Sequence, residues 1–245
     1  MYYQIAGTNV RIMGTIHLFP FHEPPLPIPS WASAAEKWAS KITIEADKET
    51  FKDIGLALPG VSARQNVPPL LWSQLAAFWP PGAPLERYRL WALMLGLGGQ
   101  MMATTPGMES YFLNEAAKHA KVVGYLETAA EFSQHAESVP QNDLIAALSE
   151  ILKVPSLPQT NLEKMYAAWV DRDIERLYDV VRVAPMFQIP SLNAAMLRDR
   201  NRAWTPAIKN LVSNEKNTLI AVGAMHLVGP GNVLECLGLP YDAVN

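Results

Sequence analysis

The chain has 245 residues, 49% of them hydrophobic and 18% charged, with a formal net charge of −3. This balance is typical of a globular protein with a substantial core. It argues against a disordered chain and against the basic surface that nucleic-acid binding requires, so we expect no nucleic-acid partner. The single cysteine, Cys236, excludes an internal disulfide and a cysteine-based zinc cluster.

The first residues of the chain, 1–6, lack the basic start and the apolar centre of a signal peptide. The longest apolar stretch, residues 90–99, is too short to span a bilayer. We therefore expect a cytoplasmic protein without a membrane span, although a chain whose leader had been removed would look the same.

The first third of the chain predicts a strand, a helix and a second strand. Residues 9–18 alternate between apolar and polar and predict a strand that ends at His17. A proline-rich loop follows, then a helical pattern over 30–38 and a β-branched run over 41–47. Strand, helix and strand in this order form a βαβ unit, which builds a parallel sheet.

Helical patterns dominate the rest of the chain. Residues 51–102 read as a helical insertion punctuated by prolines, 108–120 as a helix and 121–127 as a third strand. Residues 140–212 are mostly helical, with an interruption or a kink expected near Pro206. The run 217–223 is the clearest strand, and a short helix follows over 232–237. We expect one α/β domain over 1–245, with a central, mostly parallel sheet made of two related βαβ-type halves and helical insertions that form a lid or groove.

Two short segments share one pattern, Gly-x-x-His-Leu, at 14–18 and 223–227. Each follows an apolar run, and the chain has only five histidines. A lone histidine at a strand end is usually satisfied by backbone hydrogen bonds, but the matched pair indicates two strand ends that present His17 and His226 to one site. A glycine three residues before each histidine allows close approach of the backbone to a neighbour.

Three carboxylates occupy comparable positions. Glu45 and Glu127 end predicted strands, and Glu109 lies in the first turn of a predicted helix. Ligands of open α/β sheets bind at the carboxyl ends of the strands, and two imidazoles with a carboxylate suit Mn, Co or Zn. The alternative to a metal site is that these carboxylates have no functional role. Glu45 and Glu127 would then be solvated acids at strand ends, and Glu109 would be a favourable charge at a helix N-terminus.

Arg200 and Asn201 lie in a charged helical stretch. Such a stretch is ordinarily a solvated helix face with pairs of opposite charge. If the helix end meets the sheet edge, the guanidinium would instead orient a carboxylate or stabilise an oxyanion.

Six short segments follow one another along the chain: GTIH (14–17), IEAD (44–47), PGME (106–109), GYLET (124–128), Arg200-Asn201 followed by Trp204, and VGAMHLVG (222–229). Taken in this order, they resemble the TraB/GumN family, and the resemblance spans nearly the whole chain. The family includes the bacterial pheromone-shutdown proteins, is similar to the animal Tiki proteases, and is more distantly similar to the erythromycin esterase and ChaN-like fold group.

The resemblance implies an α/β core of two related halves with helical insertions. It also implies a divalent-metal-dependent hydrolase, with peptide cleavage in the Tiki branch. By matching motif, the paired GxxH histidines are His17 and His226. The remaining matches are the acidic positions Glu45, Glu109 and Glu127 and the Arg200–Asn201 pair.

Three functions follow as hypotheses. The first is a metal-dependent hydrolase of peptide or amide bonds, with His17, His226 and Glu45 on the metal. Its catalytic residues would be Glu109, Glu127, Arg200 and Asn201. The second is a metal-independent esterase or lactonase in which a His–Glu pair activates water. The third is a protein that binds a peptide or small molecule without turnover. The sequence leaves open which glutamate binds metal and which accepts a proton.

Overall fold

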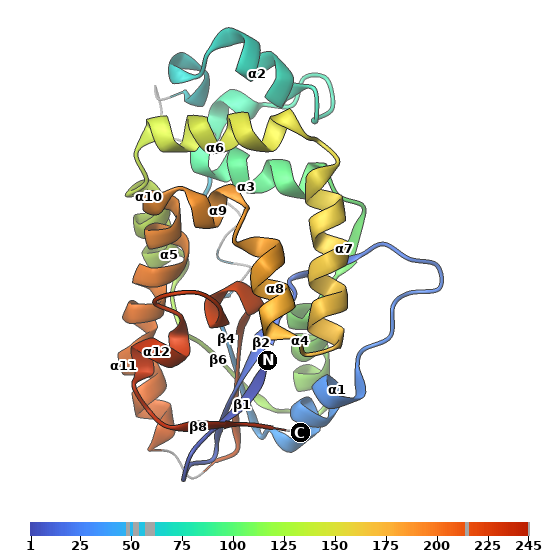
Figure 1. The fold of residues 1–245 in the computed structure, drawn as a ribbon, viewed down its shortest axis with the longest axis vertical. Coiled ribbons are helices and arrows are strands. Elements are labelled where there is room, and N and C mark those ends of the chain that lie inside the picture. Colours follow the sequence, from blue (N-terminus) through green and yellow to red (C-terminus); the bar gives the residue numbers. More distant parts are fainter. Residues whose placement is uncertain (48–49, 51–53, 57–61, 214–215, 245) are drawn as a thin grey trace.

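The computed structural model describes residues 1–47, 50, 54–56, 62–213 and 216–244 (Figure 1). Its centre is a six-stranded sheet with the order β6-β4-β7-β2-β1-β8. Four neighbouring strands, β6 to β2, are parallel, and β1 and β8 add antiparallel pairs at one edge. The strands of this sheet are β1 (Tyr2–Ile5), β2 (Val10–Thr15), β4 (Lys41–Ile44), β6 (Val122–Tyr125), β7 (Thr218–Gly223) and β8 (Tyr241–Ala243).

The α/β class and the mostly parallel sheet predicted from the sequence are therefore confirmed. The sequence patterns predicted β2, β4, β6 and β7, but they did not predict the antiparallel edge strands β1 and β8. The relation between two halves of the sheet stays a prediction. A separate two-stranded ribbon joins β3 (Leu18–Pro20) to β5 (Thr104–Pro106).

The two Gly-x-x-His-Leu segments begin on neighbouring strands. Strands β2 and β7 pair in parallel, with Gly14 opposite Val222 and Thr15 opposite Gly223. After these residues, both segments of the chain leave the sheet at the same edge. The expectation that two strand ends lie side by side is confirmed.

Helices flank the sheet and cap one end of it (Figure 1). In the view of Figure 1, α11 and α12 lie to the left of the strands, and α1, α4 and α7 lie to the right. The helices α2, α3 and α6 lie together at the top, away from the sheet. The helices are α1 (Ser30–Trp38), α2 (Pro69–Ala76), α3 (Leu90–Gln100), α4 (Met108–Lys118), α5 (Ala129–Glu137), α6 (Gln141–Lys153), α7 (Leu157–Val170), α8 (Ile174–Val181), α9 (Pro185–Gln188), α10 (Pro190–Asn193), α11 (Asp199–Val212) and α12 (Val233–Leu237).

The helical insertion predicted over 51–102 is represented by α2, α3 and two short 3-10 turns, Ala63–Asn66 and Leu85–Arg87. Residues 51–53 and 57–61 of that prediction lie outside the described residues. Within the described ranges, none of the helices combines the length and the apolarity needed to cross a bilayer.

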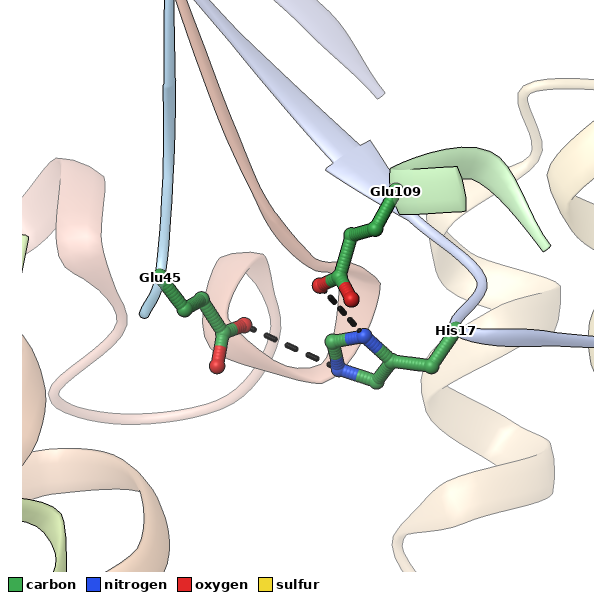
Figure 2. A group of neighbouring side chains, drawn as sticks. All are labelled: His17, Glu45 and Glu109. Atoms are coloured by element: carbon green, nitrogen blue, oxygen red, sulfur yellow. Dashed lines mark ion pairs between the residues drawn. The ribbon is translucent and has the colours of Figure 1, made fainter. Parts of the chain in front are cut away.

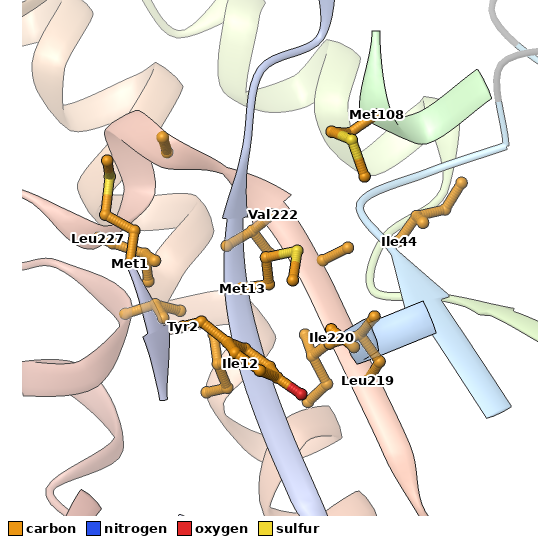
Figure 3. Packing of buried hydrophobic residues seen from close by; sticks show 14 of the residues in the cluster. Met1, Tyr2, Ile12, Met13, Ile44, Met108, Leu219, Ile220, Val222 and Leu227 are labelled. Carbon is orange, nitrogen blue, oxygen red and sulfur yellow. The ribbon is translucent and has the colours of Figure 1, made fainter. Parts of the chain in front are cut away.

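The core lies on both faces of the two central strands. Every residue of β7 is buried, and so are five of the six residues of β2. Figure 3 shows Ile12 and Met13 packed beside Ile220 and Val222. A parallel strand covered on both faces buries a continuous apolar run rather than an alternating one, which explains why 217–223 is the clearest strand in the sequence.

One of two alternatives predicted near Pro206 is wrong. The helix is not interrupted there, because the described helix α11 continues through that residue, while a kink at Pro206 stays a prediction. Trp204 and Ile208 are buried on one face of α11, and this packing outweighs the single helix hydrogen bond that a proline removes. The departure from α-helical geometry is instead a π-helical segment, Ala194–Arg198, directly before Arg200. Such segments often occur beside functional groups.

Candidate functional site

The structure brings all seven predicted site residues together at the carboxyl edge of the parallel strands. His17 follows β2, Glu45 follows β4, and His226 lies in a 3-10 turn after β7. A cavity of about 400 Å³ opens there. Six of the predicted residues line it, namely His17, Glu45, Glu109, Glu127, Arg200 and His226, and Asn201 lies behind His226.

The His17 ring lies between two carboxylates (Figure 2). Its Nδ1 atom is 2.6 Å from Glu109 Oε1, and its Nε2 atom is 3.7 Å from Glu45 Oε1. Glu109 is only 3% exposed, whereas the His17 side chain is 43% exposed. A carboxylate only accepts hydrogen bonds, so Nδ1 of His17 carries a proton; when the ring is neutral, the unprotonated nitrogen is Nε2, which faces Glu45.

The tautomer of His226 follows from its neighbours. The Asn201 amide donates from Nδ2 to the Gly231 carbonyl at 2.8 Å, which turns its Oδ1 toward His226. His226 Nδ1 lies 2.6 Å from that oxygen and must donate to it. The Nε2 atom of His226 is therefore the unprotonated one, and Arg200 Nη1 donates to it at 3.3 Å.

Glu45 is the group that both histidines face. Its Oε1 atom is 3.7 Å from His17 Nε2 and 3.7 Å from His226 Nε2. The same oxygen accepts the backbone N–H of Gly223 at 2.6 Å, and Oε2 accepts Arg200 Nη2 at 2.7 Å. The Nε2 atoms of two imidazoles thus face one carboxylate oxygen, and each ring is oriented by an acceptor on its other nitrogen.

The charge states of this group follow from burial and neighbours. Burial alone would raise the pKa of the Glu45 carboxyl, but the Arg200 guanidinium more than offsets it. With the Gly223 N–H, this cation holds that pKa well below its usual range. Burial lowers the pKa of His226 to about 3, and the Arg200 cation acts in the same direction. Near neutral pH, Glu45 is ionised and His226 is neutral.

Arg200 holds the carboxylates in place. Its Nε donates to Glu127, its Nη1 to the Met196 carbonyl and to His226, and its Nη2 to Glu45 and Glu127. These contacts engage all five N–H groups of the guanidinium. Stabilisation of an oxyanion by Arg200 stays a prediction, and in this arrangement it would require one of these contacts to break.

Two groups to which the sequence analysis gave no role complete the site. The first is the Gly223 backbone N–H on Glu45. The second is Trp204, whose Nε1 donates to Glu127 Oε2 at 3.2 Å and whose ring lies 4.6 Å from that of His226. Trp204 belongs to the segments that carry the family resemblance, and its position four residues after Arg200 on one helix face is the signal for its role in the site.

The glycine of each motif faces the other motif. A Cβ atom on Gly14 would lie 2.9 Å from Leu227 Cδ1, and one on Gly223 would lie 2.7 Å from His17 Nε2. The expected close approach of the backbone at both glycines is confirmed, and at Gly223 the neighbour is a site residue.

The fold and the site together define a class: an α/β protein that collects histidines and carboxylates from separate strand ends at one sheet edge. The chain belongs to the TraB/PrgY/gumN family, whose model matches residues 3–238 and therefore both GxxH motifs. No curated protein and no solved structure matches the chain.

Replacement of Gly223 by alanine tests the close approach to His17. Because the His17 side chain is half exposed, we expect its ring to rotate away from the new methyl group at a cost below about 1 kcal/mol in unfolding free energy. Imidazole ¹⁵N–¹H spectra should show shifted His17 signals and unchanged His119 signals. The control is Gly98→Ala, since a Cβ at Gly98 meets no atom within 4 Å. Unshifted His17 signals in Gly223→Ala would contradict the described contact.

The low pKa of His226 predicts a pH dependence of stability. An unfolded histidine titrates near 6.5 and the folded one near 3, so the unfolded chain binds the extra proton as pH falls between these values. The free energy of unfolding of the metal-free protein should fall by about 2 kcal/mol from pH 7 to pH 4.5 through this residue. Urea titrations should show a shallower pH dependence in His226→Asn. The exposed-residue control His119→Asn should match wild type, and equal slopes in all three proteins would refute the assignment.

Proposed function

We propose that this protein is a metal-dependent hydrolase that cleaves peptide or amide bonds, with His17, His226 and Glu45 holding a divalent ion such as Mn, Co or Zn. The observation that carries the proposal is the convergence of both Nε2 atoms on Glu45 Oε1, at 3.7 Å each. Ligands that each lie about 2.0–2.2 Å from one ion are at most about 4.4 Å apart, so each histidine is close enough to Glu45 to share an ion with it.

The protonation pattern also supports a metal. Both rings direct Nδ1 to an acceptor, Glu109 for His17 and Asn201 for His226, and in the neutral ring this leaves Nε2 free to bind a metal. This is the arrangement in which an acceptor behind a ligating histidine fixes its tautomer and orientation. His226 is neutral without any need to lose a proton, because burial lowers its pKa to about 3.

The balance of charges in the cavity also supports a bound metal ion. Among the described residues that line the cavity, three carboxyl groups face a single guanidinium, that of Arg200. With all three carboxyls ionised, two negative charges are left over, which a divalent cation would neutralise. Among the described residues, the ligand atoms that all lie within 4.8 Å of one another come from His17, Glu45 and Glu109. His226 is not in this group, so an ion shared by both histidines would draw the two rings closer together.

The proposed chemistry assigns a role to each side chain. A divalent ion, when bound, polarises a substrate carbonyl and lowers the pKa of a nearby water. Glu109 is the general base that takes the water proton, because Arg200 holds the other two carboxylates, Glu45 and Glu127. Arg200 and Asn201 act by holding Glu45 and His226 in place.

A second function is favoured by one contact. The His17–Glu109 pair, at 2.6 Å, has the geometry of a dyad in which a carboxylate raises the basicity of a histidine that opens on a cavity. Such a pair would activate water without metal, as in an esterase or lactonase. Activity that survives chelators would favour this reading over the first.

Metal content tests the first proposal. Protein purified without chelator or a histidine tag should carry near-stoichiometric transition metal by mass spectrometry, and His17→Ala and His226→Ala should both lose it because each removes one of three ligands. The controls His119→Ala and His135→Ala should keep it. A metal-free wild type that also fails to take up added Mn, Co or Zn would overturn the proposal.

The role of Glu109 is separable from metal binding. Glu109→Gln keeps an acceptor for His17 Nδ1 but cannot take a proton, so we expect unchanged metal content and a turnover lower by about 10²–10⁴-fold. Peptide hydrolysis measured beside metal content gives both readouts. Full activity in Glu109→Gln would assign the proton transfer to another group.

A further inference from the structure

A separate cavity of about 320 Å³ lies among the helices outside the candidate site. Its wall comes from the 3-10 turn Ala63–Asn66, the start of α3, the end of α5 and the start of α6, and we name it the outer cavity. Figure 1 shows α3 and α6 together, away from the sheet. Among the residues that the structure describes, none lines both this cavity and the site cavity, and the outer wall holds no histidine or cysteine. Its volume lies in the range of small-molecule sites, about 300–1,000 Å³, so it suits binding rather than catalysis.

One polar group in the wall of the outer cavity lacks a partner. Trp91 lines this cavity and is only 5% exposed, and its Nε1 atom has no hydrogen-bond partner among the described residues. By contrast, the indole N–H groups of Trp31, Trp169 and Trp204 all have acceptors within the protein. An indole N–H only donates, so a ligand for Trp91 must bring an acceptor atom. The N–H is enclosed, and the acceptor reaches it when a side chain of the wall rotates, a change that is common on binding.

The charges in the wall of the outer cavity cancel. Of the described residues that line it, the charged ones are Arg89 and Glu137, and these two form an ion pair with each other. A charged ligand would therefore enter without a free counter-charge, which is unfavourable. The amides of Asn66 and Gln141 also line the cavity, and an amide both donates and accepts hydrogen bonds. The wall therefore favours an uncharged ligand that carries a donor as well as an acceptor.

The rest of the wall is apolar and includes two aromatic rings, those of Tyr88 and Trp91. The aliphatic residues are Ala63, Leu90, Ala136, Val139 and Leu144. Walls of this kind bury the apolar body of a ligand, while a few polar groups fix its orientation. An apolar ring would pack against these side chains.

We propose that the outer cavity is a second ligand site, which binds an uncharged small molecule made of an apolar ring and a carboxamide group. The carbonyl oxygen of the ligand accepts the Trp91 N–H, and its amide nitrogen donates to the side chains of Asn66 or Gln141. The site lies close to the candidate catalytic site without being part of it. The Trp91 ring packs edge to face on Phe132, with ring centroids 5.6 Å apart, and Phe132 lines the site cavity.

Indole ¹⁵N–¹H spectra of the labelled protein test this proposal without any assay of turnover. The Trp91 signal is assigned by its loss in Trp91→Phe. The probes are benzamide, toluene, which lacks the acceptor, and benzoate, which carries a charge. Titrations compare wild type with Gln141→Ala, at the cavity, and with Gln134→Ala. Gln134 is the matched control, since it is an exposed glutamine on α5 that does not line the outer cavity.

We expect benzamide to move the Trp91 signal downfield in a saturable way, because the N–H gains an acceptor, and to leave the Trp31 and Trp169 signals in place. Benzamide should bind at least about fivefold more tightly than toluene or benzoate, and Gln141→Ala should weaken its binding about threefold. Gln134→Ala should match wild type. A Trp91 signal that benzamide does not shift, equal binding of toluene or benzoate, or unchanged binding in Gln141→Ala would each overturn the proposal.

Discussion

The buried contact between Arg200 and the carboxylates of Glu45 and Glu127 is the interaction on which the site depends. One guanidinium joins groups that follow two different strands, β4 and β6, and also reaches His226 after β7. Removal of Arg200 would leave buried carboxylates without a counter-charge, a far larger penalty than the loss of a surface ion pair. Arg200 reaches these carboxylates from α11, where it lies just after a π-helical turn.

The sheet supplies the second constraint. Because β2 and β7 pair in parallel, the two GxxH motifs lie side by side. The glycine of each motif has no side chain, which allows the two motifs to approach closely. His17 and His226 then differ in a useful way. His226 is buried, neutral and fixed by Asn201, whereas His17 is half exposed at the cavity. The His226 ring is therefore held in a fixed position in the site, and the His17 ring lies where a substrate would enter.

Much of this arrangement could be predicted from the sequence, because parallel sheets place strand ends at one edge. From this rule and their positions in the sequence, we predicted that four residues lie together: His17, Glu45, Glu127 and His226. The strands β1 and β8 could not be predicted, since short edge strands carry little apolar pattern. Contacts set by packing were also missed. The continuation of α11 through Pro206 depends on the buried face of that helix, and the Trp204–Glu127 hydrogen bond depends on how α11 meets the sheet.

The central claim is that His17 Nε2, His226 Nε2 and Glu45 Oε1 bind one divalent ion. The most direct measurement is an anomalous difference map from crystals grown with Mn or Co, recorded on either side of the metal absorption edge. The account predicts one strong peak within about 2.0–2.3 Å of all three atoms, with Arg200 Nη1 withdrawn from His226. A map without a peak at saturating metal, or with a peak that leaves His226 on Arg200, would contradict the paired-histidine metal site.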